Sequence, residues 1–396
     1  MSLSTLQSDV IADLAGVQPG SPLAAVRLER PEAMTHAQGS YAALFTNVGD
    51  GLSLVERLGV ALRVAILHSA TEAADHYRQR LQAAVGGGLS QWERAGGEGG
   101  VSPQNLRLQV MLKHADLLAT RPRQARPDDL QTLADAGLST VEIVTLSQVI
   151  AFVSFQVRVI AGLRLLGGGP PAASDGTTTE PIPASASKQT RAPAAQLVTP
   201  DPSLKLPTAF TVEQLEWAPW LQPLELAKAS PKQAAAREGS RGNSPYFRLL
   251  ALDVDVLTER TATDRGIFYT PGGAPRADRE LAAAATSRLN GCIYCASVHA
   301  RLSAQLSKRP EDIDRLLRDG VAPGTDLGLD PRWQAVVDLA VALAATPPSA
   351  TDDHVSRLRE IGLSDLEIMD VMQAGAFFAW ANRLMLTLGE PYYANA

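Results

Sequence analysis

Two segments of the chain that lie 225 residues apart share much of their sequence, and this repeat constrains the fold more than any other feature. Residues 133–158 and 358–383 have ten identities in 26 aligned positions. The identities include a Gly-Leu-Ser turn that begins at Gly137 in one segment and at Gly362 in the other. Self-similarity at a fixed offset is typical of a repeated structural unit. We therefore expect two tandem copies of one domain, related by internal duplication.

A stretch rich in proline and alanine separates the two copies. Residues 167–207 begin with three glycines and contain eight prolines, and no aromatic residue occurs between Phe155 and Phe210. Such a composition cannot bury enough apolar surface to fold by itself. We expect an N-terminal domain over 1–166, a partly extended linker over 167–207 and a C-terminal domain over 208–396.

Both copies carry the signals of α-helices. Ser364 is followed by Glu367, and Ser139 by Glu142, the spacing of a capping box before apolar residues at helical intervals. Further helices are predicted over residues 312–318 and 333–345. Alternating strand patterns are scarce. The sequence therefore predicts an all-α fold with a helical bundle in each copy.

Composition and charge exclude several classes of protein. Apolar residues make up 45% and charged residues 20% of the 396, an ordinary globular balance. The formal net charge is −6 and the basic residues are scattered, so we expect neither a nucleic-acid partner nor a membrane surface. No uninterrupted apolar run reaches the ~18 residues of a spanning helix, and residues 1–14 lack the apolar core of a signal peptide. We expect a cytoplasmic protein.

The two cysteines of the chain lie three residues apart, within a group of reactive side chains. On a helix, Cys292, Cys295 and His299 would share one face. A break at Gly291 would place Cys292 in the first turn, where the helix dipole and free N–H groups favour a thiolate. His299 can reach the Cys295 sulfur from one turn away. Glu280, twelve residues before Cys292, belongs to the preceding helix and can point at the same cluster.

These residues fit thiol redox chemistry, although plainer roles are open to each of them. A thiolate attacks a peroxide and becomes a sulfenic acid, which a second cysteine converts to a disulfide. The alternatives are two small core residues, or a zinc site, which would want four good ligands where this cluster has three and a distant glutamate. A thioredoxin-like site would need a βαβ setting that the sequence lacks. Glu280 could instead form a plain salt bridge with Arg279 or Arg288.

The spacing of Glu280, Cys292, Cys295 and His299 in a helical background resembles the alkylhydroperoxidase D-like (carboxymuconolactone decarboxylase-like) superfamily. The upstream sequence is similar to its peroxidase-related branch. The segments concerned are Trp217-Ala218-Pro219-Trp220, Ser244-Pro245-Tyr246-Phe247-Arg248 and Arg279-Glu280-Leu281. The resemblance covers most of 210–390 and, more faintly, 8–165. It implies two tandem bundles of the alkylhydroperoxidase D-like type.

The resemblance also implies a function and a role for each residue. The protein would be an antioxidant thiol-dependent peroxidase that reduces hydrogen peroxide or organic hydroperoxides. Cys295 would be the peroxidatic cysteine and Cys292 the more exposed resolving one, and together they would form a redox-active disulfide. His299 and Glu280 would form a water-assisted proton relay. The family needs no cofactor or metal, takes electrons from a dithiol protein reductant and forms homo-oligomers. Tyr294 stands where some members carry a second histidine.

The N-terminal copy departs further from the family pattern. Upstream of the strongest repeat the offset is 223, so that Leu58 aligns with Leu281. At that offset the places of Glu280, Cys292, Cys295 and His299 are taken by Arg57, Ser69, Glu72 and His76. Without a thiol this copy cannot run the reaction, and we expect it to serve packing, assembly or substrate recognition.

Two other classes of function remain open from the sequence. One is a thiol–disulfide oxidoreductase that acts on protein disulfides. The other is a non-redox carboxymuconolactone decarboxylase-like enzyme or binding protein, which would not need the cysteines. Fold alone does not choose between these functions.

Overall fold

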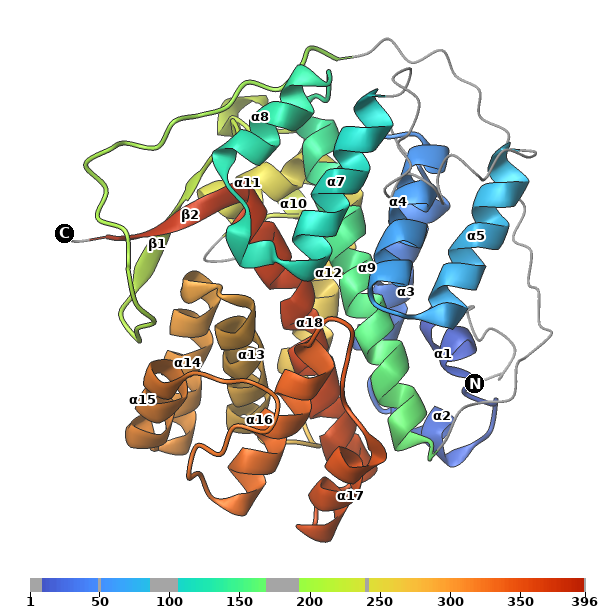
Figure 1. Cartoon of the computed structure of the whole chain (residues 1–396), viewed down its shortest axis with the longest axis vertical. Helices are drawn as coiled ribbons and strands as arrows, with labels where there is room; N and C mark the ends of the chain where they lie inside the picture. The colour runs from blue at the N-terminus through green and yellow to red at the C-terminus, as the bar shows by residue number, and fades with distance from the viewer. Residues whose placement is uncertain (1–8, 49–50, 86–105, 169–191, 239–241, 395–396) are drawn as a thin grey trace.

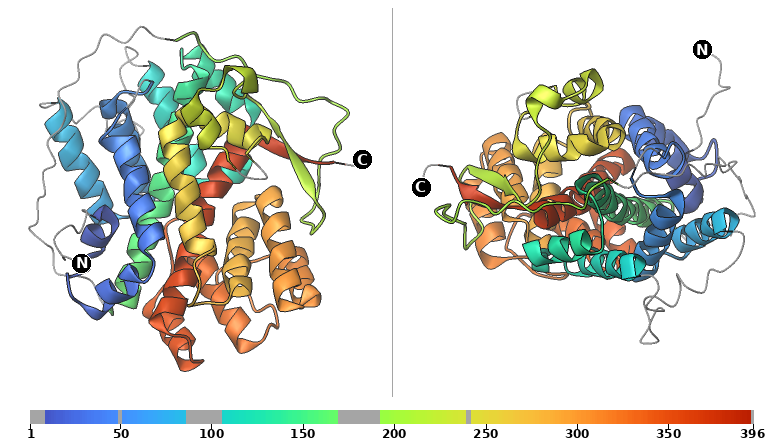
Figure 2. Two further views of the ribbon diagram at one scale, coloured as in Figure 1. Left: turned by 180° about the vertical axis from the view of Figure 1, so that it is seen from behind. Right: turned by 90° about the horizontal axis from the view of Figure 1, so that it is seen from above.

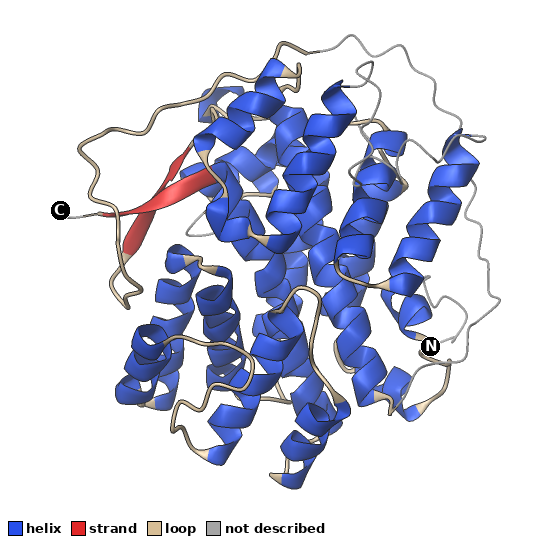
Figure 3. Cartoon of the chain, viewed as in Figure 1, coloured by secondary structure: helices blue, strands red, loops and turns tan. Residues whose placement is uncertain are grey.

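The computed structural model of the chain describes residues 9–48, 51–85, 106–168, 192–238 and 242–394, and it is all-α as predicted apart from one small sheet (Figures 1 and 3). The helices of the first half are α1 (Val10–Ala15), α2 (Pro22–Leu28), α3 (Pro31–Phe45), α4 (Leu54–Leu67), α5 (Thr71–Val85), α7 (Leu106–Thr120), α8 (Pro127–Asp135) and α9 (Thr140–Leu166). Those of the second half are α10 (Pro231–Ala235), α11 (Pro245–Leu250), α12 (Val254–Phe268), α13 (Arg276–Asn290), α14 (Ile293–Ser307), α15 (Pro310–Asp319), α16 (Pro331–Ala344), α17 (Asp352–Glu360) and α18 (Asp365–Leu388). Short 3₁₀ turns lie at Pro122–Gln124, Leu226–Lys228 and Ala251–Asp253.

The predicted helix signals are confirmed. Ser364 caps α18 and Ser139 caps α9, each in a capping box with the glutamate three residues later. The helices predicted over 312–318 and 333–345 correspond to α15 and α16, and α15 ends at Gly320. These boundaries depend on local hydrogen bonds at helix ends, which sequence spacing reveals well.

The two long helices α9 and α18 pack against each other through the middle of the molecule (Figures 1 and 2). Aromatic side chains form this contact. Measured between ring centres, Trp380 lies 5.2 Å from Phe152 and 5.5 Å from Phe155. Phe155 lies 6.3 Å from Phe377 by the same measure. The Trp380 indole N–H also donates to the Gln148 amide oxygen at 2.9 Å. One continuous hydrophobic core therefore joins the two halves.

Helix α9 has the length and the apolar composition of a membrane span, which corrects the expectation drawn from uninterrupted apolar runs. Its most apolar window is 83% buried inside the protein, by α18 and other helices. Among the described residues no other helix meets the same criteria. Burial of this kind is typical of a core helix, which passes the same test of length and composition.

Two buried arginines connect the halves in a reciprocal manner. Arg158 on α9 donates to the carbonyl oxygen of Ala344 at 2.8 Å, at the end of α16. Arg383 on α18 donates to the carbonyl oxygen of Ala119 at 2.7 Å, near the end of α7. Both donors and both acceptors are related by the same offset of 225 residues. The C-terminal ends of α16 and α7, which carry the negative end of the helix dipole, each accept hydrogen bonds from a buried guanidinium. Among the described residues, neither arginine forms a salt bridge with a carboxylate.

The order of helices α3, α4, α5, α7, α8 and α9 repeats in α12, α13, α14, α16, α17 and α18. Helices α3 and α12 also lie side by side (Figure 2), and His36 on α3 contacts Glu259 on α12 at 2.7 Å. The repeated order is consistent with the predicted duplication, and a common origin of the halves stays a prediction.

The register predicted between the halves is wrong by one residue at the turn after α4. The Ala70 N–H donates to the Ala65 carbonyl oxygen, just as Cys292 N–H donates to Ser287, and this match gives an offset of 222 instead of 223. The residues with positive φ support the same offset of 222, since Ser69 has φ 55° and Gly291, its counterpart at that offset, has φ 81°. In this register the places of Glu280, Cys292, Cys295 and His299 are taken by Leu58, Ala70, Ala73 and Tyr77. Neither register gives the first half a thiol.

The predicted linker falls partly outside the described residues, because residues 169–191 are not described. Its described part, residues 192–207, runs along the surface in an extended form (Figure 1). There Ala195 N–H donates to Leu138 at 2.8 Å, and Leu197 forms a β-bridge with Leu221. This part of the segment is therefore attached to both halves.

A small antiparallel sheet was not expected from the sequence. Strands β1 (Leu215–Pro219) and β2 (Gly389–Tyr393) pair with Trp217 opposite Pro391. Strand β2 follows α18 directly, so the sheet places Trp217 beside the end of α18, where its indole N–H donates to the Met385 carbonyl oxygen at 3.1 Å.

Candidate functional site

The two cysteines lie at the turn between α13 and α14, and one glycine makes this turn possible. Helix α13 ends at Asn290, and Gly291 has φ 81°, a conformation that costs an L-residue roughly 1 kcal/mol or more. A Cβ at this position would also lie only 2.8 Å from the Cβ of Arg123. The predicted break is therefore confirmed. It makes Cys292 the N-cap of α14 and places Cys295 in the first turn.

Both sulfurs are buried thiols, and the predicted order of exposure is wrong. Cys292 is 2% exposed and Cys295 is 6% exposed, although Cys292 was expected to be the more exposed. The reason is its N-cap position, which faces the end of α18 instead of solvent. Burial raises the pKa of the Cys292 thiol, and the neighbouring Cys295 sulfur raises it further, while the Asn382 amide acts in the opposite direction. Cys292 is therefore held as a thiol.

Glu280 and His299 form a direct side-chain contact across the two helices. The Glu280 side chain on α13 is fully buried, and its Oε2 contacts the His299 Nδ1 on α14. Burial alone would raise the pKa of Glu280, but the charges and hydrogen bonds of His299 and Arg276 outweigh it and lower the pKa. A carboxylate on Nδ1 fixes the orientation of the imidazole.

The salt bridge considered for Glu280 involves a different arginine from those predicted. Arg276, one turn before Glu280 on α13, donates from Nε to Oε1 at 2.6 Å. Arg279 instead contacts Asp370 at 3.0 Å, and Arg288 donates to the Leu317 carbonyl oxygen at 2.8 Å. Glu280 thus has a salt bridge and the contact with His299 at the same time.

Asp370 holds the start of α13 in place. It accepts from Arg30 of α2–α3 at 2.6 Å and 2.8 Å, from Arg279, and from the Ala274 N–H at 2.9 Å. Because all these groups are buried, the network fixes the turn before α13 against α18. The position of Glu280 therefore depends on contacts from both halves of the chain.

His299 lies in an aromatic environment on the same face of α14 as Cys295. The centre of the Phe378 ring lies 4.1 Å from the centre of the imidazole, and the centre of the Phe268 ring lies 5.9 Å from it. Among the described residues the structure records no hydrogen bond between His299 and the Cys295 sulfur. The Nδ1 contact with Glu280 leaves Nε2 as the nitrogen that can accept a thiol proton, directly or through water.

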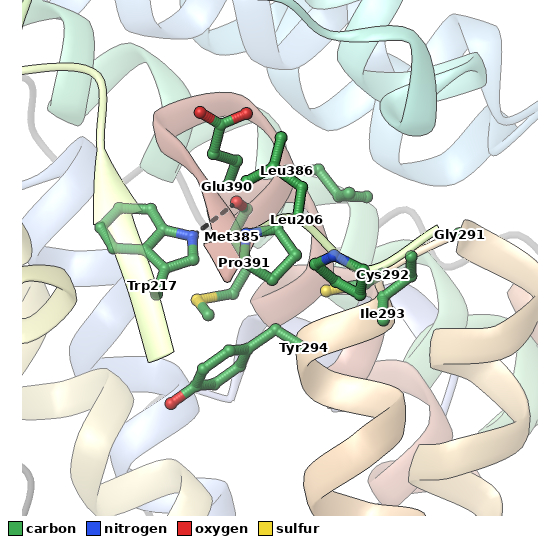
Figure 4. A pocket seen from close by; sticks show the side chains of 11 residues that line it. Leu206, Trp217, Gly291, Cys292, Ile293, Tyr294, Met385, Leu386, Glu390 and Pro391 are labelled. Atoms are coloured by element: carbon green, nitrogen blue, oxygen red, sulfur yellow. Dashed lines mark hydrogen bonds between the residues drawn. The ribbon is translucent and has the colours of Figure 1, made fainter. Parts of the chain in front are cut away.

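A small cavity of about 150 Å³ lies against Cys292 (Figure 4). It is mostly apolar, and its walls come from the turn, the end of α18 and the two strands. They are formed by Leu206, Pro207, Trp217, Gly291, Cys292, Ile293, Tyr294, Met385, Leu386, Glu390 and Pro391. The β1–β2 sheet, which the sequence did not predict, therefore builds one side of the approach to the thiols.

Three further polar residues lie close to the site; the sequence analysis named Tyr246 only within the family motif and proposed none of the three as a site residue. Tyr246 on α11 and Arg260 and Asp264 on α12 interact electrostatically with one another, and the charges of both cysteines act on Tyr246. Burial raises the pKa of Asp264, against the charges of Arg260 and His299, which lower it. Their spacing from Cys292 follows no local period, so only the packing of α11 and α12 against the site reveals them.

The corresponding part of the first half contains no thiol. Tyr77, which takes the place of His299, donates its hydroxyl to the Gln156 amide at 2.6 Å. The neighbouring His76 contacts the Tyr41 hydroxyl at 2.7 Å, and burial together with the Arg80 charge lowers the pKa of His76 to about 4. These contacts make His76 a neutral, hydrogen-bonded packing residue. Among the described residues of the first half, Leu58 and Tyr77 stand where Glu280 and His299 stand in the second, so no carboxylate–imidazole pair forms at these two positions.

The described residues contain no group of three or more His, Cys, Asp or Glu side chains arranged to hold a metal ion. Cys292, Cys295 and His299 lie at the start of α14, and Glu280 of α13 contacts the imidazole. The four predicted residues all come from α13, α14 and the turn between them.

Comparison with known proteins connects this region to a family. Residues 255–327 match the carboxymuconolactone decarboxylase family, and no curated protein matches the chain. One similar solved structure is a protein from Ralstonia eutropha JMP134, which is described as an alkylhydroperoxidase AhpD core and as an uncharacterized peroxidase-related protein. It is 26% identical to this chain, the match covers 37% of this chain and 76% of that one, and the TM-score is 0.33. An uncharacterized peroxidase-related protein from Silicibacter sp. TM1040 is also 26% identical, with 36% and 72% covered and a TM-score of 0.31. TM-scores this low support no conclusion by themselves.

The family match covers α12, α13, α14 and α15, and so includes the turn that carries the cysteines. The resemblance found in the sequence is confirmed over this segment. The segment that carries the cysteines is therefore similar to the carboxymuconolactone decarboxylase family over residues 255–327.

Proposed function

We propose that this protein is a thiol-dependent peroxidase that reduces hydrogen peroxide or organic hydroperoxides with Cys292 and Cys295. The observation that carries the proposal is the Glu280–His299 pair, which presents an oriented imidazole on the helix face that also bears Cys295. A free cysteine is mostly protonated at neutral pH, so a peroxidatic thiol needs such a base.

The proposed reaction assigns one step to each residue. His299 takes the proton of Cys295, and Glu280 stabilises the imidazolium. The Cys295 thiolate attacks the terminal peroxide oxygen, the O–O bond breaks, and the alcohol oxygen leaves with the proton from His299. The Cys292 thiol then condenses with the Cys295 sulfenic acid, which forms the disulfide and releases water. A dithiol protein reductant restores both thiols by exchange.

The pKa of Cys292 supports this division of roles. Burial and the Cys295 sulfur raise the pKa of Cys292, which suits a resolving thiol that reacts only after Cys295 has been oxidised. Cys295 also lies in the first turn of α14, where N–H groups and the helix dipole favour an anion.

The remaining parts of the proposal concern the setting of the protein. We expect a cytoplasmic homo-oligomer, with the first half as a thiol-free copy of the domain that serves packing or assembly. Residues 1–166, 167–207 and 208–396 remain the proposed division into domain, linker and domain, although the halves share one core.

The test is peroxide consumption by the purified protein with dithiothreitol as the electron donor. We expect catalytic turnover that depends on both cysteines. A redox-active pair with negligible peroxide turnover would instead favour the thiol–disulfide oxidoreductase. If double replacement of Cys292 and Cys295 by serine left the measured activity intact, a non-redox carboxymuconolactone decarboxylase-like enzyme or binding protein would be favoured.

A further inference from the structure

Tyr246 is a buried tyrosine whose hydroxyl has no hydrogen-bond partner. The residue is 8% exposed, and its hydroxyl oxygen is among the buried side-chain atoms for which the structure gives no partner. A buried polar group without a partner costs about 1–3 kcal/mol, and native proteins keep few of them. The hydroxyl therefore has an unused hydrogen-bond donor beside the site.

The tyrosine ring packs behind Trp217, one of the residues that line the cavity at Cys292. Trp217, which forms part of the cavity wall, meets the Tyr246 ring edge-on with the ring centres 5.5 Å apart. Phe247 lies 5.3 Å away in the same manner, and the Arg260 guanidinium lies 5.9 Å from the ring centre. Fixed neighbours on several sides give the hydroxyl a defined position, as a catalytic donor requires.

Tyr246 interacts electrostatically with both cysteines, and its hydroxyl remains protonated. Burial raises the pKa of Tyr246, and negative charge on Cys295 and on Cys292 raises it further, while Arg260 acts in the opposite direction. The phenol therefore keeps its proton while a thiolate is present, and it can donate a hydrogen bond without losing that proton.

We propose that Tyr246 is a further catalytic residue, whose hydroxyl donates a hydrogen bond to the leaving oxygen of the hydroperoxide as Cys295 attacks. This inference rests on the peroxidase function proposed above. The thiolate forms the S–O bond, the O–O bond breaks, and the electron pair goes to the alcohol oxygen. That oxygen receives its proton from the His299 imidazolium, and Tyr246 stabilises the charge that develops before the transfer.

The test compares two tyrosines that differ in their surroundings. Tyr246→Phe removes only the oxygen and keeps the ring contacts with Trp217 and Arg260. Tyr77→Phe is the matched control, because Tyr77 is a buried tyrosine of the thiol-free half with a hydrogen bond to Gln156. The rate of Cys295 oxidation by cumene hydroperoxide, the rate of disulfide reduction by dithiothreitol and the melting temperature are measured for both.

We expect Tyr246→Phe to lower the second-order rate of oxidation by about 100-fold, the lower end of the range known for the loss of one such donor. Disulfide reduction should change less than twofold, and the melting temperature should not fall, since the lost hydroxyl had no partner. Tyr77→Phe should lower the melting temperature and leave the oxidation rate unchanged.

Equal oxidation rates for Tyr246→Phe and the wild type would overturn the inference and mean that the hydroxyl holds only water. Tyr246→Leu provides a second test, because it also removes the ring. If the hydroxyl carries the effect, both Tyr246 variants lose oxidation rate while disulfide reduction is retained. A wild-type protein inert to peroxide would instead contradict the proposed function itself, so the two failures are distinguishable.

Discussion

The turn after α4 and the turn after α13 have the same backbone geometry and entirely different chemistry. Both turns close with the same hydrogen bond and place one residue at positive φ. The second turn carries Cys292, Cys295 and His299 beside Glu280. The first carries Ala70, Ala73 and Tyr77 beside Leu58. A turn of this kind is therefore stable without any reactive group, and the proposed function depends on four side chains placed on it.

The comparison also shows how each half fills the same space. In the first half, Tyr77 reaches across to Gln156 on α9. In the second half, the shorter His299 leaves room for Phe378 of α18 and turns its Nδ1 to Glu280.

The largest expected effect comes from removing or moving the thiols. Cys295→Ser should reduce peroxide consumption to the buffer level, because the attacking atom is lost. Cys292→Ser should still form a sulfenic acid once per chain, which a dimedone adduct of one modified cysteine in mass spectra would detect.

A transplanted thiol pair tests the same comparison from the other side. Ala70→Cys with Ala73→Cys, made in a chain whose native cysteines are serines, places two thiols on the first turn without the base. We expect peroxide to oxidise this pair at least about 100-fold more slowly than the native pair, because no imidazole–carboxylate pair assists. Equal rates would mean that His299 and Glu280 contribute nothing.

Glu280→Gln should have the next largest effect, a decrease of about 100-fold in the rate of Cys295 oxidation. In the wild type the pKa of Glu280 lies below its ordinary value of 4.5, so the carboxyl is ionised throughout the range from pH 5 to pH 8. The decrease in oxidation rate should therefore be constant over this range. Stopped-flow oxidation across this range measures it. The control is Glu142→Gln in the first half, which removes a buried carboxylate bound to Arg107 at 2.6 Å and should leave the rate unchanged.

Acid stability should distinguish the halves by a few kcal/mol. His114 on α7 is buried, and burial lowers its pKa from 6.5 to about 4. The unfolded chain therefore binds more protons between those values, so His114 removes about 3 kcal/mol of stability as the pH falls from 6.5 to 4. At the offset of 225 the second half has Leu339. Urea unfolding should show that the free energy of unfolding of His114→Leu falls less steeply with decreasing pH over this range than that of the wild type. An unchanged slope against pH would contradict the lowered pKa of His114.

The smallest expected effect concerns the two residues with positive φ. Ser69→Gly should stabilise the first turn by up to about 1 kcal/mol, since glycine adopts φ 55° without strain. Gly291→Ala should destabilise the second turn by about 1–3 kcal/mol, because it adds strain and a contact with Arg123. The melting temperatures of both variants measure these effects. Changes of the same sign would argue against a shared backbone geometry of the two turns.

The helices and the four candidate residues could be predicted because their signals are local. Capping boxes at Ser139 and Ser364 depend on residues three apart, and the spacing of Cys292, Cys295 and His299 follows one helix face. The all-α class follows from the same periodicity.

The features that the sequence did not reveal depend on packing between distant segments. Strand β1 pairs with β2 across the length of the second half, and neither strand shows a clear alternating pattern. The register error arose because His76 aligns with His299 by identity, whereas the hydrogen bonds of the turn place Tyr77 there. Tyr246 and Asp264 reach the site only through the packing of α11 and α12, and the burial of Cys292 depends on α18.

The most direct test of the central claim is a count of free thiols before and after one equivalent of cumene hydroperoxide. The account predicts the loss of two thiols per chain in the wild type, as one intramolecular disulfide between Cys292 and Cys295 identified by peptide mass, and no loss in Cys295→Ser. Two thiols that remain titratable in the wild type, with the hydroperoxide unconsumed, would contradict it.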